Sequence, residues 1–168
     1  MDNFSRFLQN PSKDTYLALR KDIIDRPDFN YLDRGISQLE KLIKEGDHQK
    51  VRAFIPQLMP THLLSPVTHL LIAESAKNAG EEEQAKQEFA MFSACLKAMN
   101  ETGDGSLESP YAVILIADEY DILRSLEETS QKQSLIEDNG RKLDKHLTES
   151  GKEIYFDVSD SLAKNPLT

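Results

Sequence analysis

The sequence contains a single cysteine, Cys95, and no tryptophan among its 168 residues. One cysteine cannot form a disulfide within the chain, and a free thiol suits a reducing compartment. No apolar stretch approaches the roughly 18 residues that a membrane-spanning helix requires. The N-terminal sequence also lacks the basic and apolar regions of a signal peptide. We therefore expect a cytoplasmic protein.

Positive charge is scarce in the C-terminal part of the chain. Residues 101–168 carry 15 acidic and 7 basic side chains, whereas residues 1–100 carry 14 and 13. The negative charge of the chain would repel the phosphate backbone of a nucleic acid or an anionic bilayer. We therefore expect neither a nucleic acid nor a membrane as partner. The change in charge indicates an N-terminal segment (1–30) and two modules (31–100 and 101–168), or one compact unit built from all three.

Sequence motifs of common enzymes and metal sites are missing. The chain has no P-loop, GxGxxG, GxSxG or CxxC motif, and its four histidines lack the HExxH spacing of zinc sites. The stretch that begins at Asn100 resembles an EF-hand loop, but Tyr111 occupies the position of the bidentate glutamate. We predict a glycine turn there, no metal and no cofactor, and a binding protein rather than an enzyme.

The first hundred residues show helical periodicity. Ser12 is a good N-cap for a helix with an apolar face, and Pro27 ends that helix. Farther along, Gly46 and Gly80 are 34 residues apart, which is the period of the tetratricopeptide (TPR) helix–turn–helix unit. Five further pairs share this spacing: Leu39 and Ala73, Leu42 and Ala76, Val51 and Ala85, Ile55 and Phe89, and Leu58 and Phe92.

This register predicts two TPR-like helical hairpins. Ala85 should be buried between paired helices, and Phe89 and Phe92 should fill the space between them. Pro56 departs from an ideal repeat, since proline inside a helix costs about 3 kcal/mol, so we expect the helix to kink or end there. Two repeats are fewer than the usual minimum of three. The open end of the array should be covered by the C-terminal module or by a second subunit in a homodimer.

A TPR-like array presents a groove that is formed by the first helix of each pair. The exposed positions of those two helices carry mixed charge, which suits a protein or peptide partner. The predicted partner-binding residues are Asp33, Ser37, Glu40, Lys44, Leu71, Glu74, Lys77 and Asn78.

The second module begins with the apolar stretch Tyr111–Ile116, which predicts a buried strand. Asp118 then acts as N-cap of a helix that packs through Tyr120, Leu123 and Leu126. Three carboxylates, of Asp118, Glu119 and Asp121, fall in the first helical turn, where they complement the helix dipole. We interpret this cluster as capping rather than as a metal or acid–base site.

Two hairpins follow. A three-residue loop, Asp138–Gly140, should set Leu135 opposite Leu143, and the turn at Ser150–Gly151 should set Leu147 opposite Ile154. The predicted core face consists of Leu135, Leu143, Leu147, Ile154, Phe156 and Val158. The predicted fold is therefore α+β: TPR-like helical hairpins followed by a small β-α-β-β-β unit with an antiparallel meander.

The opposite face of this sheet carries Asp144, His146, Tyr155 and Asp157, with His146 across from Tyr155. A histidine flanked by carboxylates can act as a general base near neutral pH. We favour a solvated sheet face, on which His146 titrates near its usual pKa. The alternative is a small hydrolase or ligand-binding enzyme that uses His146 with Asp144 or Asp157.

Several short motifs resemble a bacterial family of domains of unknown function. These motifs are the glycine loop GDG, the stretch DEYDIL, the triplet QSL and the strand IYFDV, in this order after a TPR-like segment. The resemblance covers roughly residues 30–158 and implies no particular activity or ligand. The overall interpretation is a non-enzymatic protein–protein interaction or scaffold module.

Overall fold

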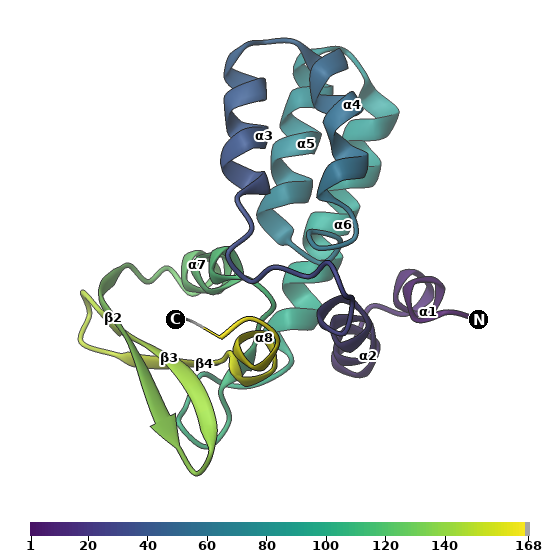
Figure 1. The fold of residues 1–168 in the computed structure, drawn as a ribbon. Coiled ribbons are helices and arrows are strands. Elements are labelled where there is room, and N and C mark those ends of the chain that lie inside the picture. Colours follow the sequence, from purple (N-terminus) through teal and green to yellow (C-terminus); the bar gives the residue numbers. More distant parts are fainter. Residues whose placement is uncertain (167–168) are drawn as a thin grey trace.

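The computed structural model describes residues 1–166, which form an α+β protein with eight helices and a four-stranded mixed sheet (Figure 1). The helices are α1 (Asn3–Gln9), α2 (Lys13–Ile24), α3 (Gly35–Lys44), α4 (His48–Leu58), α5 (Pro66–Asn78), α6 (Glu82–Asn100), α7 (Ile116–Ser125) and α8 (Ser159–Lys164). The strands are β1 (Tyr111–Ala112), β2 (Ser130–Asp138), β3 (Arg141–Thr148) and β4 (Glu153–Asp157). Helix α8 was not predicted from the sequence.

The sheet has the strand order β1-β4-β3-β2. Strands β2, β3 and β4 are antiparallel neighbours in chain order, and β1 pairs in parallel with β4. A strand over Tyr111–Ile116 was predicted, but β1 ends at Ala112. The chain leaves the sheet there and enters α7 at Ile116, so the predicted extent of the strand is wrong. The intervening apolar residues Val113, Ile114 and Leu115 are buried without being part of a strand.

The first hairpin corrects the predicted loop. Asn139 and Gly140 both have positive φ, of 49° and 79°, as a two-residue type I′ turn requires. Asp138 therefore pairs with Arg141, and the predicted three-residue loop is wrong. As a result, Leu135 lies opposite Asp144 instead of Leu143, and Leu135 is 47% exposed.

The second hairpin also differs from the prediction by one residue. His146 lies opposite Ile154, and Leu147 lies opposite Glu153. A shift of one residue moves every side chain of a strand to the other face of the sheet. Asp144 and His146 were predicted to lie on a solvated face of the sheet. They lie instead on its buried face, together with Ile154 and Phe156.

Two hydrophobic clusters form the core. The smaller one lies inside the helical array and consists of Leu39, Val51, Leu58 and Ile72. The larger one joins residues of all three predicted segments, with Phe7 and Tyr16 from the first, Cys95 from the second, and Phe156 from the third. The N-terminal helices, the long helix α6 and the sheet therefore pack around a common core.

The 34-residue register matches the structure at some positions and fails at others. Gly46 and Gly80 follow α3 and α5 with φ of 73° and 79°, the left-handed conformation that glycine adopts easily. Ala85 is only half-buried, and Phe89 is 54% exposed. The prediction that Phe89 fills the space between the paired helices is therefore wrong. Helix α4 contains Pro56 and ends two residues later, at Leu58.

Arg20 ties the N-terminal segment to the C-terminal module. Its side chain is buried, and Nε donates a hydrogen bond of 2.9 Å to the carbonyl of Val113. Nη1 lies 2.6 Å from the carboxylate of Asp160 at the start of α8. A buried guanidinium is tolerated because its donors are paired in this way.

We predict that Arg20→Ala lowers the free energy of unfolding by about 3 kcal/mol. The substitution removes two charge-assisted hydrogen bonds and leaves the Val113 carbonyl unpaired in the core. Urea unfolding followed by circular dichroism measures the effect. The neighbouring substitution Lys21→Ala is the control, because that exposed ion pair with Asp25 is screened by solvent and contributes little. Equal losses for the two variants would contradict the role of Arg20.

Candidate functional site

Three carboxylates of α7 are buried, although acidic side chains at a helix N-terminus are usually exposed. The exposed fractions are 1% for Asp118, 0% for Glu119 and 5% for Asp121. Of the three apolar residues that were predicted to face the core, Leu123 is buried at 1%, whereas Tyr120 and Leu126 are 38% and 39% exposed. The acidic side chains of α7 point into the protein beside Leu123.

Asp118 stabilises the start of its own helix, but from a different position than predicted. The N-cap is Leu115, and Asp118 is the third helical residue. Its Oδ2 accepts hydrogen bonds from the backbone N–H groups of Ile114 and Leu115, at 3.1 and 2.9 Å. The predicted capping role is therefore supported by these bonds, whereas the predicted N-cap position is wrong.

Asp121 connects α7 with the helical array. Its Oδ2 accepts a hydrogen bond of 2.9 Å from the backbone N–H of Val67, the second residue of α5. Ser65, the N-cap residue of α5, makes no side-chain capping bond. Asp121 therefore provides from another helix a capping interaction that α5 lacks locally. Arg124 pairs with the other carboxylate oxygen of Asp121.

Glu119 joins α7 to the sheet through His146. The Nε2 atom of His146 lies 2.7 Å from Oε2 of Glu119, and both side chains are completely buried. The other ring nitrogen, Nδ1, lies 2.7 Å from the hydroxyl of Ser130 on β2. The rings of Tyr120 and Phe156 contact the imidazole edge-on, with centroids 5.4 and 5.3 Å away. Both ring nitrogens of His146 thus have partners within the protein.

Asp144 completes this buried polar cluster. Its side chain is 7% exposed and accepts a hydrogen bond of 3.1 Å from the amide nitrogen of Gln133. The same nitrogen lies 3.3 Å from Oε2 of Glu119, so Gln133 bridges the two carboxylates. Tyr31 lies close to this pair, and burial together with the charges of Glu119 and Asp144 raises the pKa of its hydroxyl.

Burial changes the protonation of the cluster. It raises the pKa of Asp118 to about 7 and the pKa of Glu119 well above its usual range, and the charge of Asp144 raises the latter further. Burial lowers the pKa of His146, against the opposing effect of the Asp144 charge. One oxygen of Asp118 and one of Glu119 have no hydrogen-bond partner among the described residues, which further favours the neutral carboxyl.

The predicted catalytic candidates are divided between the two faces of the sheet. Asp144 and His146 belong to the buried cluster, whereas Tyr155 and Asp157 lie on the opposite face. Tyr155 pairs with Lys145, not with His146, and the carboxylate of Asp157 accepts hydrogen bonds from Ser159. Within residues 1–166 no group of three or more histidine, cysteine or acidic side chains is arranged to hold a metal.

The predicted partner-binding residues do not share one surface. Ser37, Glu40 and Lys44 are exposed on α3. Oδ1 of Asp33 lies 2.6 Å from Nε2 of the buried His62. Leu71 packs against the smaller hydrophobic cluster. Asn78 borders a small cavity beside α3. The remaining two residues, Glu74 and Lys77, border a groove between α5 and α6 that sequence reasoning did not locate.

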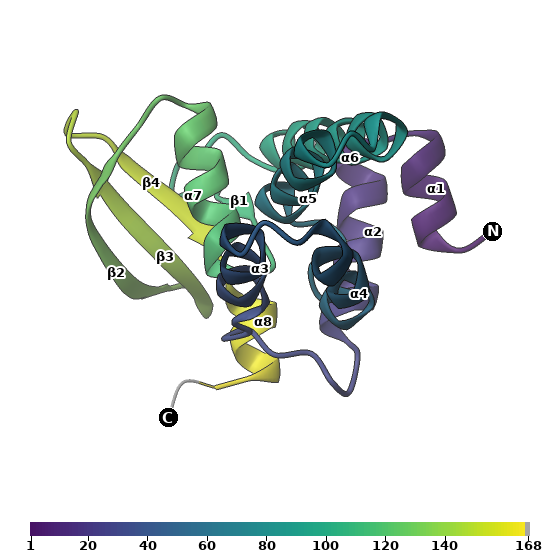
Figure 2. The same ribbon diagram turned by 90° about the horizontal axis from the view of Figure 1, so that it is seen from above.

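This groove is an exposed and largely apolar feature of the helical array. It has a volume of about 500 Å³ and is lined by Leu70, Ala73, Glu74, Lys77, Glu82, Ala85, Lys86, Phe89 and Ala90. Figure 2 looks down these helices and shows α3 and α4 packed on one side of the α5–α6 pair. The groove lies on the other side of the pair, where no further helix pair follows α6 among residues 1–166, and we call this side the outer face.

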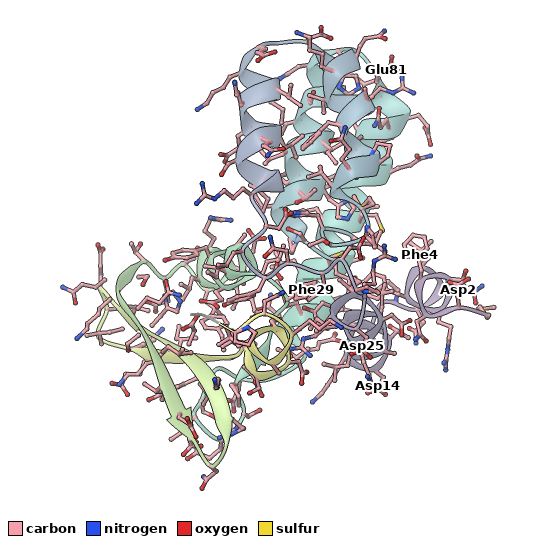
Figure 3. All side chains as sticks on the ribbon, in the orientation of Figure 1. Asp2, Phe4, Asp14, Asp25, Phe29 and Glu81 are labelled. Carbon is pink, nitrogen blue, oxygen red and sulfur yellow. The ribbon has the colours of Figure 1, made fainter. Side chains whose placement is uncertain are left out.

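A second groove extends the outer face toward α1. Its volume is about 560 Å³, and it is lined by Phe7, Leu8, Pro11, Gln87, Ala90, Met91 and Ala94. Ala90 of α6 belongs to both grooves, so they are continuous along this helix. Leu8 is 49% exposed beside α1, and Phe89, next to Ala90, is 54% exposed where the two grooves meet. Figure 3 shows the side chains along these helices, with Glu81 at the α5–α6 turn and Phe4 on α1 labelled.

A family model described as a domain of unknown function (DUF4919) matches residues 36–166. Comparison with curated proteins and with solved structures finds no match. Among the helices of residues 1–166, none has both the length and the apolar character that a membrane crossing requires.

Asp118 should make stability depend on pH in an unusual direction. Its folded pKa of about 7 exceeds the unfolded value of 3.8, so the folded state holds the proton more tightly. The stability that this group contributes is complete below about pH 4 and is lost as pH rises toward 7. We predict that Asp118→Asn removes this loss, at most about 1.4 kcal/mol per pH unit.

The measurement is the free energy of unfolding of wild type and variant at several pH values from 4 to 8. The altered hydrogen bonds of the variant change its free energy of unfolding by the same amount at every pH. As pH rises, however, the free energy of unfolding of wild type should fall relative to that of the variant. A difference that is the same at every pH would contradict the raised pKa of Asp118.

His146→Ala should cost about 3 kcal/mol or more at pH 7. The substitution leaves Glu119 and Ser130 without their partner inside the core and creates a cavity. Thermal and urea unfolding measure this loss. Lys145→Ala, one residue earlier on the opposite face, is the matched control and should cost much less, because its ion pair with Glu153 lies at the surface. A mild effect of His146→Ala would restore the solvated-face interpretation.

Proposed function

We propose that the chain, which belongs to the DUF4919 family of domains of unknown function, is a non-enzymatic protein–protein interaction module. Its binding surface is the outer face of α5 and α6, on which a helical surface of a partner protein packs. The observation that carries this proposal is Phe89, a large aromatic side chain that is 54% exposed inside an apolar groove. Exposed apolar grooves with charged rims are typical of interaction sites.

The TPR-like organisation supports the same proposal. Helix pairs α3–α4 and α5–α6 carry the 34-residue register, and each unit of such an array buries its apolar face against the next unit. The outer face of α5 and α6 is where a third unit would pack, and α1 covers only its far end. A partner that packs there would take the place of the missing unit.

The other parts of the interpretation follow from charge and from Cys95. The net charge of −9 argues against nucleic acids and anionic membranes as partners. Cys95 is buried, and burial raises its thiol pKa, so it can remain reduced in the cytoplasm without reacting. The hydrolase alternative has less support, because His146 is completely buried and Asp157 lies on the other face of the sheet.

Photo-crosslinking from defined positions tests the binding surface. A photoreactive phenylalanine derivative in place of Phe89 should give a discrete protein adduct in cells that express the protein. The same residue in place of Glu40, in the middle of α3 and in the groove first predicted from the sequence, serves as the control and should give none. Absence of an adduct from position 89, or an adduct from position 40 alone, would overturn the proposed surface.

A further inference from the structure

We propose that the partner on the outer face is a second copy of this chain, related by a two-fold axis parallel to α5 and α6. This inference rests on the proposed function, because it names the occupant of the same surface. It goes beyond that function in specifying which helices face each other and which charges meet.

Four charged residues border the groove: Glu74 and Lys77 on α5, and Glu82 and Lys86 on α6. None of them belongs to an ion pair among residues 1–166. Each helix thus presents one acidic and one basic side chain, and the sum of the four charges is zero. Such a surface attracts a partner with the same alternation placed in the opposite order.

The hairpin geometry determines the levels of these charges along the helices. Helices α5 and α6 are joined by only three residues, 79–81, and both line one groove. Counting away from this turn at the same rise per residue places Glu74 level with Lys86 and, to within about one residue, Lys77 level with Glu82. By the same count, Leu70 is level with Phe89 to within about one residue.

A two-fold axis parallel to the helices preserves these levels and places α5 of one copy over α6 of the other. Glu74 then meets Lys86 of the second copy, and Lys77 meets Glu82 of the second copy. The symmetry makes each of these contacts twice, so all eight rim charges of the dimer are paired. A two-fold interface of this kind is the commonest way in which protein chains associate.

The apolar part of the groove agrees with this arrangement. Phe89 of one copy falls at the level of Leu70 in the other, where the small side chains of Ala73, Ala85 and Ala90 leave room for a ring. The adjoining groove beside α1 continues the contact along α6 toward Leu8. This extension matters because a stable dimer usually buries about 800 Å² on each partner.

A two-fold axis perpendicular to the helices is the competing arrangement. It would pair Glu74 with Lys77 of the second copy and Glu82 with Lys86 of the second copy. It would also place Phe89 opposite the turn at residues 79–81, away from the apolar groove. Burial of Phe89 therefore favours the parallel axis.

Charge-reversal variants in analytical ultracentrifugation test the inference. Wild type should sediment as a dimer of the 19.0 kDa chain. Glu74→Lys and Lys86→Glu should each weaken the dimer about tenfold or more, because each places like charges opposite each other at two symmetric contacts. An equimolar mixture of the two variants should recover wild-type affinity, since both contacts then join opposite charges. Phe89→Ala should also weaken the dimer.

The equimolar mixture of Glu74→Lys and Lys86→Glu distinguishes the parallel two-fold axis from the perpendicular one. With the perpendicular axis, the lysine that Glu74→Lys introduces would still face Lys77 of the other variant, so the mixture would remain weak and the proposed symmetry would be overturned. Glu40→Lys on α3 is the control and should leave the dimer unchanged. Thermal melting shows whether each variant is folded.

Two outcomes separate the inference from the proposed function. A wild type that stays monomeric at high micromolar concentration overturns the dimer, while an adduct of position 89 with a different protein would keep the interaction surface. A monomer that also gives no adduct overturns both. An adduct with twice the mass of the chain, together with rescue by the mixture, supports both.

Discussion

The contact between Glu119 and His146 holds helix α7 against strand β3 of the sheet. A carboxyl group and an imidazole that are both fully buried are stable only when each has a partner, since an unpaired buried charge costs several kcal/mol. Here each is the partner of the other, across the boundary between α7 and β3. Glu119 therefore points toward the sheet, whereas Tyr120, the next residue, is 38% exposed. Asp121, on the same helix, reaches the start of α5.

The sequence predicted the α+β composition and the capping tendency of Asp118, because both depend on residues close together in the chain. It did not predict the buried polar cluster, because His146 and Glu119 are 27 residues apart and neither carries a sign of its partner. The faces of β3 were inverted because the apolar residues Leu135 and Leu143 were assumed to lie opposite each other. The preference of Asn139-Gly140 for a two-residue turn outweighs that apolar pairing. The Asn-Gly dipeptide was the signal that could have corrected the register.

The helical array shows a different limit of prediction from sequence. Leu39 and Val51 are buried as the 34-residue register requires, since a helical hairpin must pack on itself whatever follows it. Phe89 belongs to the same register but is 54% exposed, whereas Ile55, its counterpart 34 residues earlier, is half-buried. The register therefore identifies positions that can be buried and does not determine which of them are.

The two polar features of the structure have opposite consequences for function. His146 bonds to Glu119 and Ser130, and the exposed amide of Gln133 bridges Glu119 and Asp144. A reacting substrate would therefore have to displace the contacts that join α7 to the sheet. Chemistry at that site would therefore destabilise the fold on which it depends. On the outer face, by contrast, the four rim charges of the α5–α6 groove are exposed and form no ion pair within residues 1–166, so a partner can bind them without breaking a salt bridge of the free chain. The arrangement of charges thus favours binding at the surface over catalysis in the interior.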